Sequence, residues 1–167
     1  MANMYKKIIQ LILRAAELAR SVGIPNILQP GLVKEMIIAD ILGHTLISTK
    51  RNADACDPHN DKILYEYLSC KEGGSGQFDR MFKEPVTKRQ ESLNRIRRNR
   101  KVYFAVFYAD NQIKVKVIYE LEPDVVVTET ERQLDGSRNV ISHVGFSEAW
   151  AKNNGTVVYP ESNEAER

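Results

Sequence analysis

The fold of this chain is decided by the stretch Tyr65-Glu66-Tyr67-Leu68-Ser69-Cys70-Lys71, which closes a run of β-forming residues that begins at Ile63. Aromatic and aliphatic side chains fill this run, so we predict a strand over residues 63–71. Side chains two apart on a strand share a face. The strand should therefore carry Ser69 and Lys71 on one face and Glu66 on the other.

The other elements follow from the spacing of apolar residues. Helical spacing predicts a first helix from Met4 to about Val22, and Pro30–Gly31 begins a second helix over residues 32–42 that Gly43 ends. The remaining expectations are a strand over 45–49, a turn region over 50–62, a flexible glycine loop over 73–76, a basic helix over 87–99, a buried strand over 102–108, a half-exposed strand over 113–117, a charged and loop-rich region over 120–138 and a last strand over 155–159. Together they predict an α/β fold in one domain, residues 1–167, with a central mixed β-sheet flanked by helices.

Composition limits the classes of protein to consider. The chain has 167 residues, of which 43% are hydrophobic and 28% charged, and this is ordinary for one globular domain. No apolar run approaches the roughly 18 residues that span a bilayer, so we expect no membrane partner. The start of the chain lacks the features of a signal peptide, and the only cysteines are Cys56 and Cys70. We therefore expect reduced thiols in a cytoplasmic protein, and the spacing of cysteine and histidine does not suggest zinc.

Charge is distributed unevenly along the chain. The formal net charge is only +2. However, residues 88–101 contain seven basic residues and one acid, whereas the C-terminal residues are acidic. A basic patch offset by an acidic tail points weakly to a polyanionic partner.

Asp54 and Lys71 suggest the chemistry of phosphodiester hydrolysis. Such a reaction needs a metal ion to offset developing charge, an activated water and accurate positioning. Magnesium prefers carboxylate oxygens, and Asp54 is an acid that the turn region can bring to the strand. Lys71, with Ser69 on the same face, is placed to orient a water and to stabilise charge in the transition state.

These residues resemble the PD-(D/E)XK nuclease superfamily, and within it the small type II restriction endonucleases. The resemblance extends over most of the chain and preserves the order of its parts. It is carried by the segments Leu42-Gly43-His44-Thr45-Leu46, Asn52-Ala53-Asp54-Ala55-Cys56-Asp57, Glu66-Tyr67 to Lys71, Phe104-Ala105-Val106-Phe107-Tyr108, Ile118-Tyr119-Glu120-Leu121-Glu122-Pro123 and Gly155-Thr156-Val157-Val158-Tyr159. It implies a restriction-endonuclease-like fold and a Mg²⁺ cofactor, with no organic cofactor.

The resemblance also assigns roles in the site. It makes Asp54 a metal ligand and Lys71 the catalytic lysine, with the backbone carbonyl of Cys70 as a further metal ligand. The family's second acid, two residues before the lysine, falls on Ser69, so another carboxylate must complete the metal site. The candidates are Glu35, Glu66, Glu72 and Glu84. Strand alternation argues against Glu66, and we favour Glu35 as both a catalytic residue and a metal ligand.

Recognition of double-stranded DNA is expected from the residues that follow the catalytic strand. Glutamine can bond adenine and arginine can bond guanine in the major groove, and basic side chains suit phosphate contacts. The predicted DNA-binding residues are Ser75, Gln77, Asp79, Arg80, Lys83, Lys88, Arg89, Arg95, Asn139 and His143.

Three functions remain open at this point. The first is a type II restriction endonuclease, a homodimer that cleaves both strands of a palindromic site, with residues 1–23 as the helix that forms the dimer contact. The second is a structure-specific or repair nuclease of the same superfamily. The third is a DNA-binding module that has lost catalysis, which the serine at position 69 favours.

Overall fold

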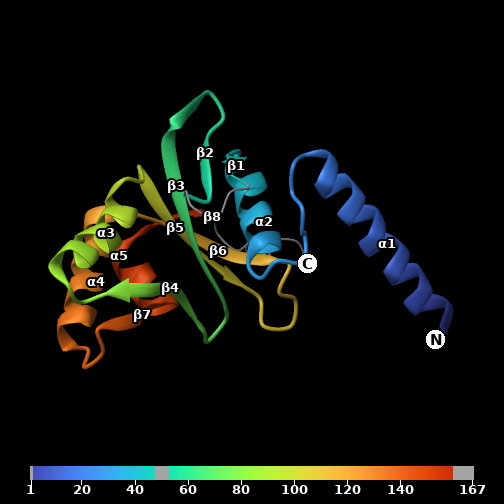
Figure 1. The fold of residues 1–167 in the computed structure, drawn as a ribbon. Coiled ribbons are helices and arrows are strands. Elements are labelled where there is room, and N and C mark those ends of the chain that lie inside the picture. The colour runs from blue at the N-terminus through green and yellow to red at the C-terminus, as the bar shows by residue number, and fades with distance from the viewer. Residues whose placement is uncertain (1, 48–52, 160–167) are drawn as a thin grey trace.

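A computed structural model describes residues 2–47 and 53–159 of the chain (Figure 1). Six strands form the central sheet in the order β1-β2-β3-β5-β6-β8. Strands β3 and β5 are parallel, and each of the other neighbouring pairs is antiparallel. The sheet is therefore mixed, as predicted. Its strands are β1 (Thr45–Leu46), β2 (Ala55–Asp57), β3 (Asn60–Lys71), β5 (Lys101–Phe107), β6 (Val115–Leu121) and β8 (Thr156–Tyr159).

Helices and a second, two-stranded sheet cover the two faces of the central sheet. The second sheet pairs β4 (Ser75–Phe82) with β7 (Ile141–Ser147) in antiparallel fashion. It lies beside α3, α4 and α5 on one side of the central sheet, while α2 lies on the other (Figure 1). The helices are α1 (Ala2–Ser21), α2 (Leu32–Leu42), α3 (Val86–Arg97), α4 (Pro123–Gly136) and α5 (Glu148–Asn154).

Strand β3 separates two hydrophobic clusters. Leu68 and Cys70 pack into the larger cluster, together with residues of β4, β7, α3 and α4. Tyr65 and Tyr67 pack into the other cluster, which includes Ile38 of α2. The alternation of side chains along this strand is therefore as predicted, and it decides which residues can share a site.

Several predicted elements are confirmed. Helix α2 has the predicted bounds and ends at Gly43, whose φ of 68° is the left-handed conformation that glycine adopts easily. The first helix, the basic helix and the buried strand are found within two residues of their expected ends. Of the strand predicted over 45–49, residues 45–46 are found and residues 48–49 lie outside the described part.

Other predictions are wrong. The glycine loop ends at Gly74, because Gly76 is a buried residue of β4. The region predicted as loop after Glu120 contains the end of β6 and helix α4. That helix begins with Pro123 in its first turn and buries Val126, Thr130 and Leu134, which are spaced four residues apart on one face. The region predicted as a turn over 50–62 contains β2 and the start of β3, and strands β4 and β7 and helix α5 were not predicted.

Helix α1 stands apart from the sheet in Figure 1. Near its end, Ala19 is buried in a small cluster with Ile24 and Leu32. Most of its apolar side chains are exposed to solvent, including Tyr5, Ile9, Leu11, Leu13 and Leu18. No helix in residues 2–47 and 53–159 has the length and apolar character needed to cross a membrane.

Candidate functional site

Asp54 lies at the point where strand β2 stops pairing with strand β3. The backbone N–H of Asp54 donates to the carbonyl of Tyr65 at 3.1 Å. Two residues along β3, the N–H of Tyr67 donates to the Asp54 carboxylate at 2.7 Å. The carboxylate of Asp54 thus accepts the hydrogen bond that a next residue of the neighbouring strand would otherwise accept from Tyr67.

Further contacts fix the position of Tyr67. Its hydroxyl lies 2.8 Å from Nδ1 of His44. The His44 ring in turn stacks on Tyr65, with 4.0 Å between ring centroids. This packing holds the backbone donor that orients the Asp54 carboxylate.

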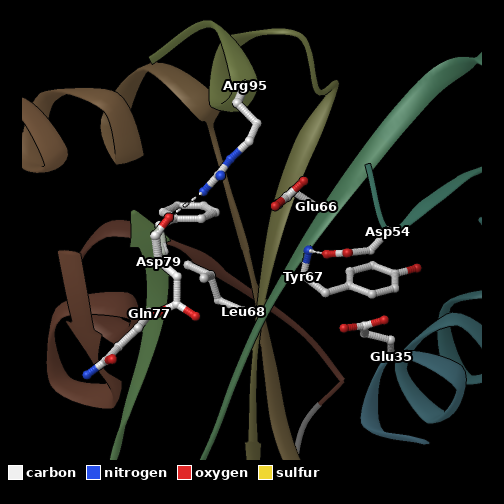
Figure 2. A pocket seen from close by; sticks show the side chains of 9 residues that line it. Glu35, Asp54, Glu66, Tyr67, Leu68, Gln77, Asp79 and Arg95 are labelled. Carbon is white, nitrogen blue, oxygen red and sulfur yellow. Dashed lines mark hydrogen bonds between the residues drawn. The ribbon is translucent and has the colours of Figure 1, made fainter. Parts of the chain in front are cut away.

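A polar pocket of about 250 Å³ opens beside Asp54 (Figure 2). Three acidic side chains meet there from different elements: Glu35 from α2, Asp54 from the segment before β2, and Glu66 from β3. The lining residues are Glu35, Asp54, Glu66, Tyr67, Leu68, Gln77, Phe78, Asp79 and Arg95.

Glu66 has the most strongly raised pKa of the three acids. Its Oε2 atom is buried and makes no hydrogen bond among the residues described. Burial, followed by the charge of Asp54, raises the pKa of Glu66 from 4.5 to about 8. A buried acceptor without a hydrogen-bond partner typically lowers folding stability by about 1–3 kcal/mol. A cation or a hydrogen-bond donor that binds this oxygen would remove that cost.

The pKa values of the other two acids are also raised. Burial raises the pKa of Asp54 to about 6, against the lowering effect of the hydrogen bond from Tyr67 and of the nearby arginines. Burial and the charge of Asp54 raise the pKa of Glu35 to about 7. Carboxyl groups that share a cleft with raised pKa values are typical of functional sites.

Lys71 and Ser69 do not join this pocket, and here the predicted arrangement must be corrected. Lys71 is exposed at the end of β3 and is not among the lining residues. Five residues separate it from Glu66, which is roughly 16 Å along a strand at about 3.3 Å per residue. Alternation places Ser69 and Lys71 on the face opposite Glu66, as predicted. Neither lines the pocket, which Glu35 reaches from α2 on that opposite side of the sheet.

The exclusion of Glu66 by strand alternation was therefore wrong. The physical reason is the position of Asp54. Its carboxylate accepts from the backbone N–H of Tyr67, next to Glu66 in the strand, so the pocket beside it includes Glu66 as well as Glu35. Glu35 lines the pocket beside Asp54, as expected from its helix. The predicted ligand carbonyl of Cys70 belongs to a residue outside the pocket lining, and its side chain packs in the larger core cluster.

The two remaining candidate acids lie elsewhere. Glu72 accepts a hydrogen bond from the N–H of Ala109 and pairs with Lys116 at 3.0 Å. Glu84 lines a separate, mainly apolar hollow with Pro85. Neither contributes to the Asp54 pocket.

The predicted DNA-reading residues lie together on the β4–β7 sheet. Ser75, Gln77 and Asp79 are exposed on β4, alternating with the buried Gly76 and Phe78. Across from them on β7, His143 is exposed and its Nδ1 lies 2.7 Å from Asp79. Arg80 is also exposed, at a bulge where its φ is 54°. Gln77 and Asp79 also line the pocket, so this polar surface is continuous with it.

The predicted phosphate-binding residues are more varied. Lys83 donates to the carbonyls of Asp135 and Ser137 at the end of α4, and Arg89 pairs with Asp135 at 2.7 Å, so both tie α3 and β4 to α4. The other residues of this group are Lys88, which is exposed and paired with Glu91, Asn139, which is exposed near the start of β7, and Arg95, which lines the pocket.

The residues in this pocket suit a magnesium ion by their chemistry. Within the described ranges, no three His, Cys, Asp or Glu side chains already form a metal-binding group. Magnesium usually takes only one or two protein carboxylates and keeps several waters, so it does not require such a group. Asp54 and the unpartnered oxygen of Glu66 would hold the ion.

Comparison with other proteins does not assign a family. Neither the models of known protein families nor the curated proteins include a match to this chain.

Proposed function

We propose that this protein is a magnesium-dependent deoxyribonuclease of the PD-(D/E)XK type, acting as a type II restriction endonuclease in the cytoplasm. The observation that carries this proposal is the meeting of Glu35, Asp54 and Glu66 in one pocket that continues onto a polar, exposed β-sheet. The acids suit a metal and a reacting water, and the adjoining surface suits a nucleic acid.

The residues of the pocket divide the work of hydrolysis. A bound magnesium ion would neutralise phosphate charge and acidify a water. The water oxygen attacks phosphorus while one phosphorus–oxygen ester bond breaks. The proton of the water passes to Glu35, whose pKa of about 7 suits a base at neutral pH. The departing ester oxygen takes a proton from solvent, which leaves a phosphate monoester and an alcohol.

The β4–β7 surface is proposed to enter a groove of the duplex. Gln77, Asp79, Arg80 and His143 carry donors and acceptors of the kinds that read base edges. Their sheet adjoins the pocket, so binding there would bring a backbone phosphate close to the acids. A two-stranded ribbon is narrow enough for the major groove.

Helix α1 is proposed as the dimer contact. An isolated helix with this much exposed apolar surface is expected to be covered in the working molecule. A second copy of the chain, related by a two-fold axis, would bury the same face on both partners. Two pockets would then face the two strands of a palindromic site.

A DNA-binding module without catalysis is the second candidate. One observation favours it: Leu68, not a lysine, follows Glu66 at the spacing that the nuclease superfamily uses for its catalytic cation. Such a protein would bind DNA with strong dependence on salt and would cut none.

Digestion of supercoiled plasmid with magnesium, manganese or excess chelator tests these functions. Metal-dependent production of discrete fragments supports a restriction endonuclease, and preferential cutting of branched DNA supports a repair nuclease. Asp54→Asn and Glu66→Gln should each abolish cutting, whereas Glu72→Gln, a glutamate outside the pocket, should not. Salt-sensitive binding without cutting under any metal would replace the nuclease by the binding module.

A further inference from the structure

The pocket lacks a cation on strand β3. Glu66 and Leu68 are two residues apart and therefore share a face of the strand. Leu68 lines the pocket but is 3% exposed and packs into the larger core cluster. A phosphodiester gains charge on its oxygens during hydrolysis, and strand β3 provides no positive group at this place to stabilise it.

Arg95 brings a guanidinium group to the same pocket from a different element. It lies in helix α3, and its side chain runs from that helix toward the space beside Glu66 (Figure 2). Arg95 lines the pocket together with Leu68 and the three acids. Its charge reaches the acids, because it lowers the pKa values of both Asp54 and Glu66 against the effect of burial.

The contacts of Arg95 orient the group without using all its donors. Its Nη2 atom lies 3.4 Å from the carbonyl of Asp79, which is long for a hydrogen bond to oxygen, and 3.4 Å from the sulfur of Met81, a weak acceptor. The guanidinium carbon is 5.6 Å from the centre of the Phe78 ring. The Nε atom is buried and has no hydrogen-bond partner among the described residues. An arginine has five N–H donors in a plane, a geometry that matches two oxygens of a phosphate.

We propose that Arg95 is the catalytic cation of this pocket and that it binds the scissile phosphate in place of the lysine that position 68 lacks. This inference rests on the proposed nuclease function. It changes the role of Arg95 from a general phosphate contact along the duplex to a contact with the reacting group. Arg98, one turn further along the chain and exposed, also lowers the pKa values of Asp54 and Glu66 by its charge, but it does not line the pocket.

Single-turnover cleavage with enzyme in excess over DNA isolates the chemical step from binding. Arg95→Gln should lower the cleavage rate by about 10²–10³-fold, the usual cost of losing a donor to a transition-state oxyanion. Arg95→Lys keeps the positive charge but not the planar set of N–H donors, so it should cut faster than Arg95→Gln and more slowly than the wild type. DNA affinity measured with calcium, without cutting, should change by less than about tenfold for either variant.

Arg97→Gln is the matched control. Arg97 lies on the same helix, is partly exposed and sits 3.8 Å from Glu131, outside the pocket. Its loss should weaken DNA binding at most, and leave the single-turnover rate at saturation within about threefold. Urea unfolding of each variant shows whether a slow variant is simply misfolded.

The double variant that combines Arg95→Gln with Leu68→Lys tests whether a lysine on strand β3 can restore the cleavage rate. A lysine at position 68 shares the strand face of Glu66, so it should restore at least tenfold of the rate lost in Arg95→Gln. A structural role for Arg95 predicts no such recovery. If the wild-type protein cuts no DNA, the nuclease proposal and this one both fail. If the wild type cuts and a folded Arg95→Gln variant cuts equally fast, only the role of Arg95 is overturned.

Discussion

Replacing Glu35 by glutamine is expected to make the metal-free protein more stable at alkaline pH and unchanged at acidic pH. The pKa of Glu35 is raised from 4.5 to about 7 in the folded protein, first by burial and then by Asp54. The unfolded chain therefore releases a proton that the folded chain retains. Protonation of Glu35 therefore stabilises the folded protein relative to its ionised form. This contribution is fully present below about pH 4.5 and is lost as pH rises through about 7.

The magnitude follows from the two pKa values. At about 1.4 kcal/mol per pKa unit, ionising Glu35 in the folded protein costs roughly 3 kcal/mol. The side chain is only partly buried, and solvent screening reduces this to on the order of 1–2 kcal/mol. Glutamine carries no charge at any pH and avoids the whole cost, so above about pH 8 the variant should be the more stable by that amount.

Urea unfolding in chelator, followed by tryptophan fluorescence, measures the difference. The single tryptophan, Trp150, packs on Phe146 with 4.8 Å between ring centroids and should report loss of the core. Glu17→Gln, at an exposed position of α1, is the control and should alter stability little at any pH. A Glu35→Gln effect that is the same at pH 5 and pH 9 would refute the argument that this carboxyl group is desolvated.

Three further results are expected. Lys71→Ala should leave cleavage within about twofold, because this exposed residue lies roughly 16 Å along the strand from Glu66; an inactive variant in a plasmid assay would restore Lys71 to the site. Gly76→Ala should destabilise the fold by about 1–3 kcal/mol in urea unfolding, because its Cβ would sit 2.9 Å from the buried ring of Phe104; equal stability would contradict this tight contact. Leu11→Glu with Leu18→Glu, both exposed on α1, should convert a dimer to a folded monomer in sedimentation analysis, and a wild-type monomer would remove the proposed role of the helix.

Local pattern was enough to predict much of the fold. Helix α2 is framed by Pro30–Gly31 and Gly43, and strand β5 is a continuous apolar run, so each has a strong signal of its own. Helix α4 also has one, in Pro123 at its start and in Val126, Thr130 and Leu134 spaced four apart. The many charged residues between these positions make the helical spacing hard to recognise in the sequence.

The site was harder to predict because it depends on contacts between distant segments. Strand alternation correctly separated Glu66 from Lys71, but nothing in the local sequence shows where β2 stops pairing with β3. That end point decides the position of Asp54. Arg95 enters from a helix almost thirty residues further along the chain, and only packing of α3 against β4 brings it to the pocket.

The energetic balance of the pocket gives the strongest argument that it has a ligand. Placing Glu35, Asp54 and Glu66 together costs stability, as their raised pKa values record. The fold does not require them, since two apolar clusters on either side of the sheet already provide its core. The charges of Arg95 and Arg98 act against this cost, yet the pKa values of Asp54 and Glu66 remain raised. A divalent cation would supply positive charge here, and its binding would release the protons that these groups retain and recover the stability that they cost.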